Sequence, residues 1–121
     1  MELKRKTIET LLSLYKDDGL ELGGYVKDTG EVVICENDSP NPLENFSFKM
    51  DDLMKINDEE GTIALFHTHP NGTSAMTKQD FRAFVNYPNF YHLIVGKNGL
   101  LCYKVTERET VIIEDLATDE S

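Results

Sequence analysis

The residues of this sequence best suited to chemistry are two histidines separated by one position, His67 and His69. They follow a short apolar run, so they fall at the end of a strand predicted over residues 62–68. Residues i and i+2 of a strand point to the same face, and two neutral imidazoles on one face suit Zn²⁺. The pair by itself is a weak signal, because two histidines at a strand end are often only polar surface residues.

Asp80 is the candidate for a third ligand. A helix is predicted to begin after Thr77, which places Asp80 in its first turn, where the carboxylate can reach back toward the end of the strand. Three protein ligands leave one position for water, as in catalytic zinc sites. Asp80 also has a purely structural interpretation, since Thr77 and Asp80 have the N-cap and N3 spacing of a capping box. The two roles are compatible.

A catalytic zinc also needs a base for the proton of its water, and Glu21 is the candidate. This residue lies at the start of a predicted strand that carries Gly23 and Gly24. Two plainer interpretations stand beside this one. Glu21 is one of 22 acidic residues, most of them simply solvated, and the glycine pair is typical of a bulge or of a close approach between two backbones.

Together these residues resemble the JAMM motif of the MPN-plus, or JAB, zinc metalloproteases. That motif is a Glu on an early strand, then His-Ser/Thr-His-Pro, a Ser separated from the second His by seven residues that include the Pro, and an Asp three residues later. Here His67–Pro70 is followed at the same spacing by Thr77 and Asp80, and Glu21 precedes a glycine-containing segment. The match of four parts at fixed spacing is far more specific than any one part.

The resemblance implies a role for each matched position. His67, His69 and Asp80 would hold zinc, and Glu21 would accept the proton of the attacking water and pass it to the leaving amine. Thr77 occupies the position of the family's Ser, whose hydroxyl helps to stabilise the oxyanion. A Thr keeps this hydroxyl but is restricted at χ1, and its role as N-cap competes for the same oxygen.

The resemblance covers residues from about 21 to 105 and implies the α/β/α sandwich of the family, which is cytidine-deaminase-like. The short chain is typical of prokaryotic and phage members, and the stretch 35–42, with residues 46–48 further on, is similar to the proteolytic domain of phage tail assembly proteins of the lambda type. The implied reaction is hydrolysis of a peptide or isopeptide bond. The implied substrate is a ubiquitin-like modifier or a structural protein of a phage tail.

The elements that must position these residues follow from periodicity and turn residues. Helices are predicted over residues 8–18, 51–56 and 78–87, and strands over 20–26, 31–36, 46–49, 62–68, 90–95, 100–105 and 110–114. Their order predicts an α/β fold with a single domain over residues 1–115, built as an α/β sandwich around a mixed sheet, which agrees with the α/β/α sandwich that the resemblance implies. A short acidic tail is expected over residues 116–121.

Composition limits the function classes and the compartment. The chain has 121 residues with 12 basic and 22 acidic side chains, and its formal net charge of −10 disfavours binding to nucleic acid. No apolar run approaches the ~20 residues that span a bilayer. Cys35 and Cys102 are isolated in predicted strands, as expected of small buried residues in a reducing compartment. We expect a cytoplasmic protein of a bacterial or phage-infected cell, or a part of a particle assembled there.

Other function classes stay open at this point, as does the oligomeric state. A binding or scaffold module could use the same fold with a structural zinc and no turnover, although all four key positions are filled. A nucleobase deaminase would need Pro-Cys-x-x-Cys ligands, which the sequence lacks, and a two-metal phosphatase would need more His and Asp ligands. The remaining histidine, His92, alternates with Phe90 and Ile94 and is predicted to be structural.

Overall fold

The computed structural model describes residues 3–17, 19–43, 45–58, 61–106 and 109–117. A six-stranded sheet lies at its centre, in the order β2-β1-β3-β4-β5-β6. The strands are β1 Gly23–Lys27, β2 Val32–Cys35, β3 Thr62–Thr68, β4 Tyr91–Gly96, β5 Gly99–Thr106 and β6 Glu109–Ala117. The pair β3–β4 is parallel and the other neighbouring pairs are antiparallel, so the sheet is mixed.

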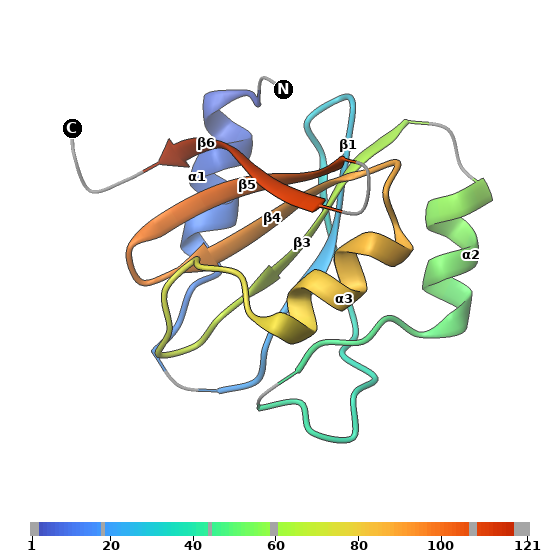
Figure 1. Ribbon diagram of the computed structural model, residues 1–121, viewed down its shortest axis with the longest axis horizontal. Helices are drawn as coiled ribbons and strands as arrows, with labels where there is room; N and C mark the ends of the chain where they lie inside the picture. Colours follow the sequence, from blue (N-terminus) through green and yellow to red (C-terminus); the bar gives the residue numbers. More distant parts are fainter. Residues whose placement is uncertain (1–2, 18, 44, 59–60, 107–108, 118–121) are drawn as a thin grey trace.

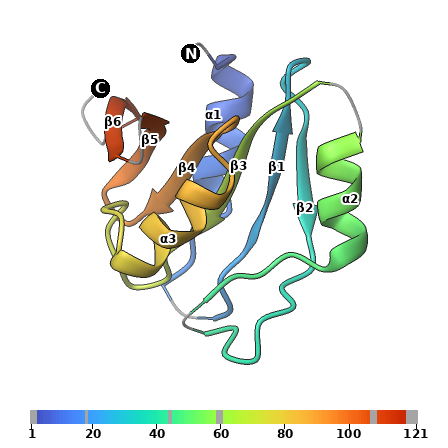
Figure 2. The ribbon, with the colours of Figure 1, turned by 45° about the vertical axis from the view of Figure 1, so that its right-hand side comes forward.

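Three helices cover the two faces of the sheet: α1 Arg5–Ser13 on one face, and α2 Met50–Asp58 and α3 Lys78–Asn86 on the other (Figures 1 and 2). Leu11 of α1 packs into a buried cluster with Phe66. On the opposite face, Ile56 of α2 packs with Leu65, and Phe84 of α3 packs into a separate cluster. The molecule is therefore a mixed α/β fold with a sheet buried on both faces, as the sequence predicts.

The parallel pair β3–β4 fixes where α3 must lie. Parallel neighbours need a crossover connection, and α3 with its preceding loop supplies it. The helix begins at its N-cap residue Thr77 and ends before Pro88, as predicted. In consequence the end of β3 and the first turn of α3, which carry the candidate ligands, belong to one crossover unit.

The strand predicted over residues 46–49 is not formed. This segment is irregular, and its backbone bonds to the preceding loop, since Asp38 N–H donates to the Ser47 carbonyl (2.9 Å) and Ser47 N–H donates to Asn37 Oδ1 (3.3 Å). Phe46 and Phe48 both pack against the α2 cluster. The alternation of apolar residues that suggested a strand therefore reflects packing of one side of the segment, without pairing to the sheet.

Boundaries of α1, β1 and β6 also differ from the prediction by three residues or more. α1 ends at Ser13 because the N–H groups of Leu14 and Tyr15 bond to carbonyls three residues back, which tightens the last turn. β6 reaches Ala117, which pairs with Leu100, so the strand includes the first residues of the predicted acidic tail. Residues 118–121 of that tail lie outside the described part.

Cys35 and Cys102 are buried and form no disulfide bond, as predicted. Cys35 belongs to the cluster beneath α2, whereas Cys102 belongs to the cluster beneath α1, on the other face of the sheet. Among the described helices, none has both the length and the apolar character needed to cross a bilayer.

Candidate metal centre

The end of β3 presents both histidines to the face covered by α2 and α3. His67 is paired with Gly23 of β1 on one side and with Ile94 of β4 on the other. Hydrogen bonding continues beyond the strand, where His69 N–H donates to the Val95 carbonyl (2.9 Å). Because positions 67 and 69 lie two apart on this extended chain, their imidazoles share one face of the sheet.

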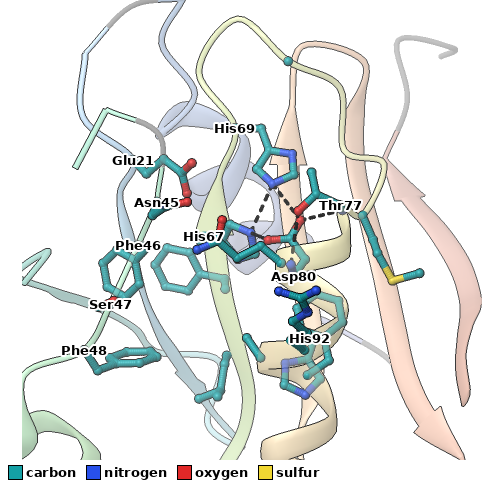
Figure 3. Close-up of a pocket in the computed structure, with 18 of the residues that line it drawn as sticks. Glu21, Asn45, Phe46, Ser47, Phe48, His67, His69, Thr77, Asp80 and His92 are labelled. Carbon is teal, nitrogen blue, oxygen red and sulfur yellow. Dashed lines mark hydrogen bonds and ion pairs between the residues drawn. The ribbon is translucent and has the colours of Figure 1, made fainter. Parts of the chain in front are cut away.

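The structure brings His67, His69 and Asp80 together (Figure 3). Nε2 of His67 lies 3.1 Å from Nε2 of His69 and 2.9 Å from Oδ1 of Asp80. The second oxygen of Asp80, Oδ2, lies 3.1 Å from Nε2 of His69. All three side chains are largely buried, with 12–14% of their surface exposed. The convergence that the sequence required of these residues is therefore present.

These separations fit a metal ion. The two Nε2 atoms lie 3.1 Å apart and each lies 2.9–3.1 Å from a different oxygen of Asp80, close to the edge of roughly 3.3 Å that metal–ligand bonds of ~2.0–2.1 Å give in a tetrahedron. Two imidazole nitrogens and one carboxylate oxygen form a mixed donor set that binds divalent transition metals. His67, His69 and Asp80 could therefore hold a metal ion.

The capping box of α3 fixes the carboxylate of Asp80. Asp80 N–H donates to Thr77 Oγ1 (3.1 Å), and Thr77 N–H donates to Asp80 Oδ2 (2.9 Å). The same carboxylate thus closes the start of the helix and faces the two imidazoles. The capping interpretation of Asp80 is confirmed, and the cap leaves the carboxylate facing the imidazoles, so the two interpretations are compatible, as the sequence allowed.

A backbone carbonyl fixes the ring of His69. Nδ1 of His69 lies 2.8 Å from the Thr73 carbonyl oxygen, and since a carbonyl can only accept, Nδ1 carries the hydrogen and donates it. This leaves Nε2, the atom that faces His67 and Asp80, as the lone-pair nitrogen of the neutral ring. Such partners orient a ligating histidine and select its tautomer.

The loop that carries Thr73 is itself held by Tyr103 of β5. The Tyr103 hydroxyl donates to the Ser74 carbonyl (2.9 Å) and accepts from Met76 N–H (3.0 Å). Ser74 is fully buried and bonds to Asn98 through both its N–H and its hydroxyl. These supporting residues were not predicted from the sequence, because their pairing joins positions far apart in the chain and no local spacing signals it.

Glu21 lies beside this cluster, two residues before β1 begins. Leu22 N–H donates to Thr68 Oγ1 (3.0 Å), and Thr68 N–H donates to the Leu22 carbonyl (2.8 Å). Continuing this antiparallel register by one residue sets Glu21 opposite His69. The side chain points toward the histidines (Figure 3).

Burial changes the protonation of Glu21. The residue is only 7% exposed, and no hydrogen bond to its carboxylate comes from another described residue. Burial raises its pKa to about 7, an effect that the nearby His69 partly offsets and the negative charge of Asp80 reinforces. At neutral pH the carboxyl group is therefore populated in both forms.

Gly23 and Gly24 allow close approaches next to Glu21. A Cβ at Gly24 would lie 1.9 Å from the Val33 carbonyl oxygen, and a Cβ at Gly23 would lie 2.7 Å from the ring of Phe46. The glycine pair thus serves a close approach of backbone and ring, one of the interpretations that the sequence left open.

The charges of the cluster are coupled. Burial opposes the negative charge of Asp80, but hydrogen bonds from His67 and from the protonated form of His69 outweigh it and hold the pKa of Asp80 far below the usual aspartate range. Burial likewise opposes a positive charge on His69, and hydrogen bonds to Asp80 and to the Thr73 carbonyl outweigh it and raise the pKa of His69. Asp80 is therefore ionised, as a metal ligand must be.

His92 is not part of the cluster. Its Nε2 lies 2.9 Å from the Tyr87 carbonyl oxygen, to which it donates, and its ring stacks on Phe84 with centroids 4.3 Å apart. Burial lowers its pKa to about 4, so the ring is neutral at physiological pH. These contacts agree with the structural role predicted for this residue.

A cavity of about 950 Å³ opens from the candidate ligands into the space between α3 and the segment before α2. Glu21, His67, His69, Thr77 and Asp80 line one end of it (Figure 3). Apolar side chains from the segment 46–48 and from α2 line another part. A molecule of some size can therefore reach the cluster.

Comparisons with known proteins support a class of fold and nothing finer. No protein-family model matches the sequence, and no curated protein matches it. Among solved structures, the solution structure of protein DSY2949 from Desulfitobacterium hafniense is similar, with a TM-score of 0.70 and 20% sequence identity over 93% of this chain and 88% of that chain. At this identity the similarity shows a shared mixed α/β fold.

Proposed function

We propose that this protein is a zinc metalloprotease of the JAMM type, which hydrolyses a peptide or isopeptide bond and has the MPN, or JAB, form of the α/β/α sandwich. The observation that carries the proposal is the buried carboxyl group of Glu21 beside the converging donors of His67, His69 and Asp80. The motif spacing supports it, because the same residues match the JAMM pattern.

Zinc is the ion proposed, because two imidazoles and a carboxylate form a common ligand set of catalytic zinc. When bound, zinc supplies Lewis acidity to the scissile carbonyl and lowers the pKa of water. The chain itself supplies the ionised carboxylate of Asp80 and the lone pair on Nε2 of His69. The Thr77 N–H fixes the carboxylate, and the Thr73 carbonyl fixes the imidazole ring of His69.

Glu21 acts as the proton carrier in this proposal. Its carboxylate accepts a proton from the water that attacks the carbonyl carbon, and returns a proton to the amine nitrogen as the carbon–nitrogen bond breaks. A pKa of about 7 suits both steps, since the acid and the base form are each available near neutral pH. The proton that Glu21 gains in the first step is the one it gives up in the second.

Thr77 is proposed to donate a hydrogen bond to the oxyanion. Its hydroxyl oxygen already accepts from Asp80 N–H, but the hydroxyl hydrogen is not used in that bond and can still be donated. The helix cap and the oxyanion role therefore use different parts of one hydroxyl group.

The test separates metal binding from turnover. Glu21→Gln should keep one zinc per chain and lose cleavage by about 100-fold or more. His69→Ala should instead lose zinc, measured as metal per chain after dialysis. Suitable substrates are linear fusions and lysine-linked isopeptides of a ubiquitin-like modifier, and phage tail proteins. Glu31→Gln, at an exposed acid in the turn before β2, is the matched control and should change neither property.

Two outcomes would contradict the proposal. Substantial turnover in Glu21→Gln would show that another group carries the proton. Zinc bound by the wild-type protein without cleavage of any substrate would favour the alternative of a non-catalytic binding or scaffold module with a structural zinc. The open cavity at the ligands speaks for the enzyme, since a structural zinc site is closed by four protein ligands.

A further inference from the structure

The cavity extends well beyond the candidate ligands, and one part of it has an apolar wall. Four side chains form this apolar wall: Phe46, Phe48, Leu53 and Tyr87. Each of them is only half-buried, so apolar surface remains open to the cavity. They come from the segment before α2, from α2 itself and from the end of α3, three parts of the chain that line one cavity together with Leu65 of β3.

Packing holds the apolar wall in place. The rings of Phe46 and Phe48 meet edge to face with centroids 4.9 Å apart, a favourable aromatic geometry. The ring of Phe46 lies against Gly23, where any Cβ would collide with it. Hydrogen bonds from Asp38 and to Asn37 fix the backbone between the two phenylalanines. The wall is thus preformed, as is usual for ligand pockets.

Charge is distributed unevenly along the cavity. Among the described lining residues, the carboxylates are Glu21 and Asp80 at the ligand end, and the cation is Arg82, which is exposed on α3. The apolar wall has no charged side chain of its own. Burying a charge there without a partner would be unfavourable, so the wall selects for an apolar group.

We propose that the apolar wall is a specificity pocket for a large apolar side chain, of the phenylalanine, leucine or methionine class, next to the scissile bond of a peptide substrate. The inference rests on the proposed function, and it adds the substrate class to it. A volume of about 950 Å³ is more than one amide group needs. Side chains of an extended peptide follow one another at about 3.4 Å per residue, so a residue flanking the bond over the ligands falls within this one cavity.

The proposal is tested first by binding, which does not depend on turnover. N-acetyl-phenylalaninamide, N-acetyl-leucinamide and N-acetylglycinamide are titrated into the protein with and without zinc, and backbone amide shifts are followed by NMR. Both large probes should bind roughly 10- to 100-fold more tightly than the glycine probe, as expected for burial of one large apolar side chain. The shifts should centre on Phe48, Leu53 and Tyr87.

Two neighbours on α2 provide matched variants. Leu53 lines the cavity, whereas Met54 is exposed and does not line it. Leu53→Asn should remove most of the preference for the large probes, and Met54→Asn should leave it unchanged. Ala83→Trp, at an exposed position of α3 that also lines the cavity, should block the large probes and leaves the core untouched. Thermal unfolding of each variant reports on folding.

The outcomes for the pocket and for the protease are distinguishable. Equal affinity for the three probes, or shifts away from the apolar wall, would overturn the pocket even if peptides are cleaved. A strong preference lost in Leu53→Asn supports the pocket even if no peptide is cleaved, and would leave only the proposed reaction in error. With active protein, kcat/KM for peptides that differ at either residue flanking the bond should follow the same order as the binding.

Discussion

Glu21 is buried although no described residue donates a hydrogen bond to its carboxylate. Such a group lowers the stability of the fold once it is ionised, because burial removes part of the hydration of its charge and no described residue replaces it with a hydrogen bond. The nearby charge of Asp80 adds to this effect. A residue that disfavours the folded state in this way, at the end of a cavity, is typical of a functional site.

The stability of the metal-free protein should therefore improve when Glu21 is replaced by Gln. In the folded state the pKa of Glu21 is about 7, above the ordinary value of 4.5, so the folded state binds more protons than the unfolded state between these two pH values. The stability that this proton uptake gives the fold is present at low pH and is lost as the pH rises through 7. Glu21→Gln should raise the free energy of unfolding by roughly 1–3 kcal/mol at pH 8. This gain in the free energy of unfolding should vanish at pH values below the ordinary glutamate pKa of 4.5.

Urea unfolding of both proteins at pH 8 and at pH 4, each with a chelator present, checks this expectation. Asp80 titrates below this range in the folded state and is present in both proteins, so its effect cancels in the comparison. A variant that is less stable than wild type at pH 8 would mean that the carboxylate has a partner that outweighs its burial.

At the scale of elements, the site depends on how one strand ends and one helix begins. β3 supplies two imidazoles on one face, and the first turn of α3 supplies a carboxylate that is already oriented as part of a capping box. The loop between them is held by Tyr103, which bonds to both Ser74 and Met76. The ligand geometry is thus set by secondary structure and by backbone contacts of the loop.

The cap and the ligand should respond together to a change at Thr77. Thr77→Ala removes the hydroxyl that accepts from Asp80 N–H and should lower stability by about 1 kcal/mol. It should also weaken metal affinity by roughly 10-fold, because the first turn of α3 loses its cap, and this turn sets the position from which the Asp80 carboxylate accepts the Thr77 N–H. Thr77→Ser keeps the hydroxyl and should restore both properties, measured by urea unfolding and by competition with a zinc indicator. Unchanged zinc affinity in Thr77→Ala would show that the cap does not position the ligand.

At the scale of the whole molecule, a bound ion would link β3 to α3 across the loop. Ligands that bind only the folded state stabilise it by mass action, by about 2.7 kcal/mol when the free ligand is 100 times its dissociation constant. Zinc should accordingly raise the unfolding temperature of the wild-type protein and have no such effect on His69→Ala. The rise should shrink in acid, where protons compete for His69, whose pKa is raised.

Calorimetric scans with zinc and with a chelator, at pH 7.5 and at pH 5.5, measure this effect. A substitution of His92 is the control for His69→Ala, because the ring of His92 contacts Tyr87 and Phe84 and lies outside the cluster. Its loss should leave the stabilisation by zinc in place. Equal stabilisation of wild type and His69→Ala by zinc would place the ion elsewhere.

The sequence by itself determined those features that depend on local spacing. The i, i+2 relation of His67 and His69, the cap formed by Thr77 and Asp80, and the order of most elements all follow from the periods of strands and helices. It was wrong for residues 46–49, because alternating apolar residues look alike whether a segment pairs with a sheet or packs one side against a core. Pairing is decided by partners that the local pattern does not contain.

The tertiary structure alone decided what lies around the candidate ligands. The burial of Glu21 opposite His69 depends on the register between β1 and β3, and the hydrogen bond that fixes His69 depends on a loop held from β5. The apolar wall exists because an irregular segment, α2 and the end of α3 line one cavity. Local spacing in the sequence determines which side chains can share a face of a strand or helix. Cavities and pKa shifts depend instead on groups that are distant in the chain and that exclude water where they pack together.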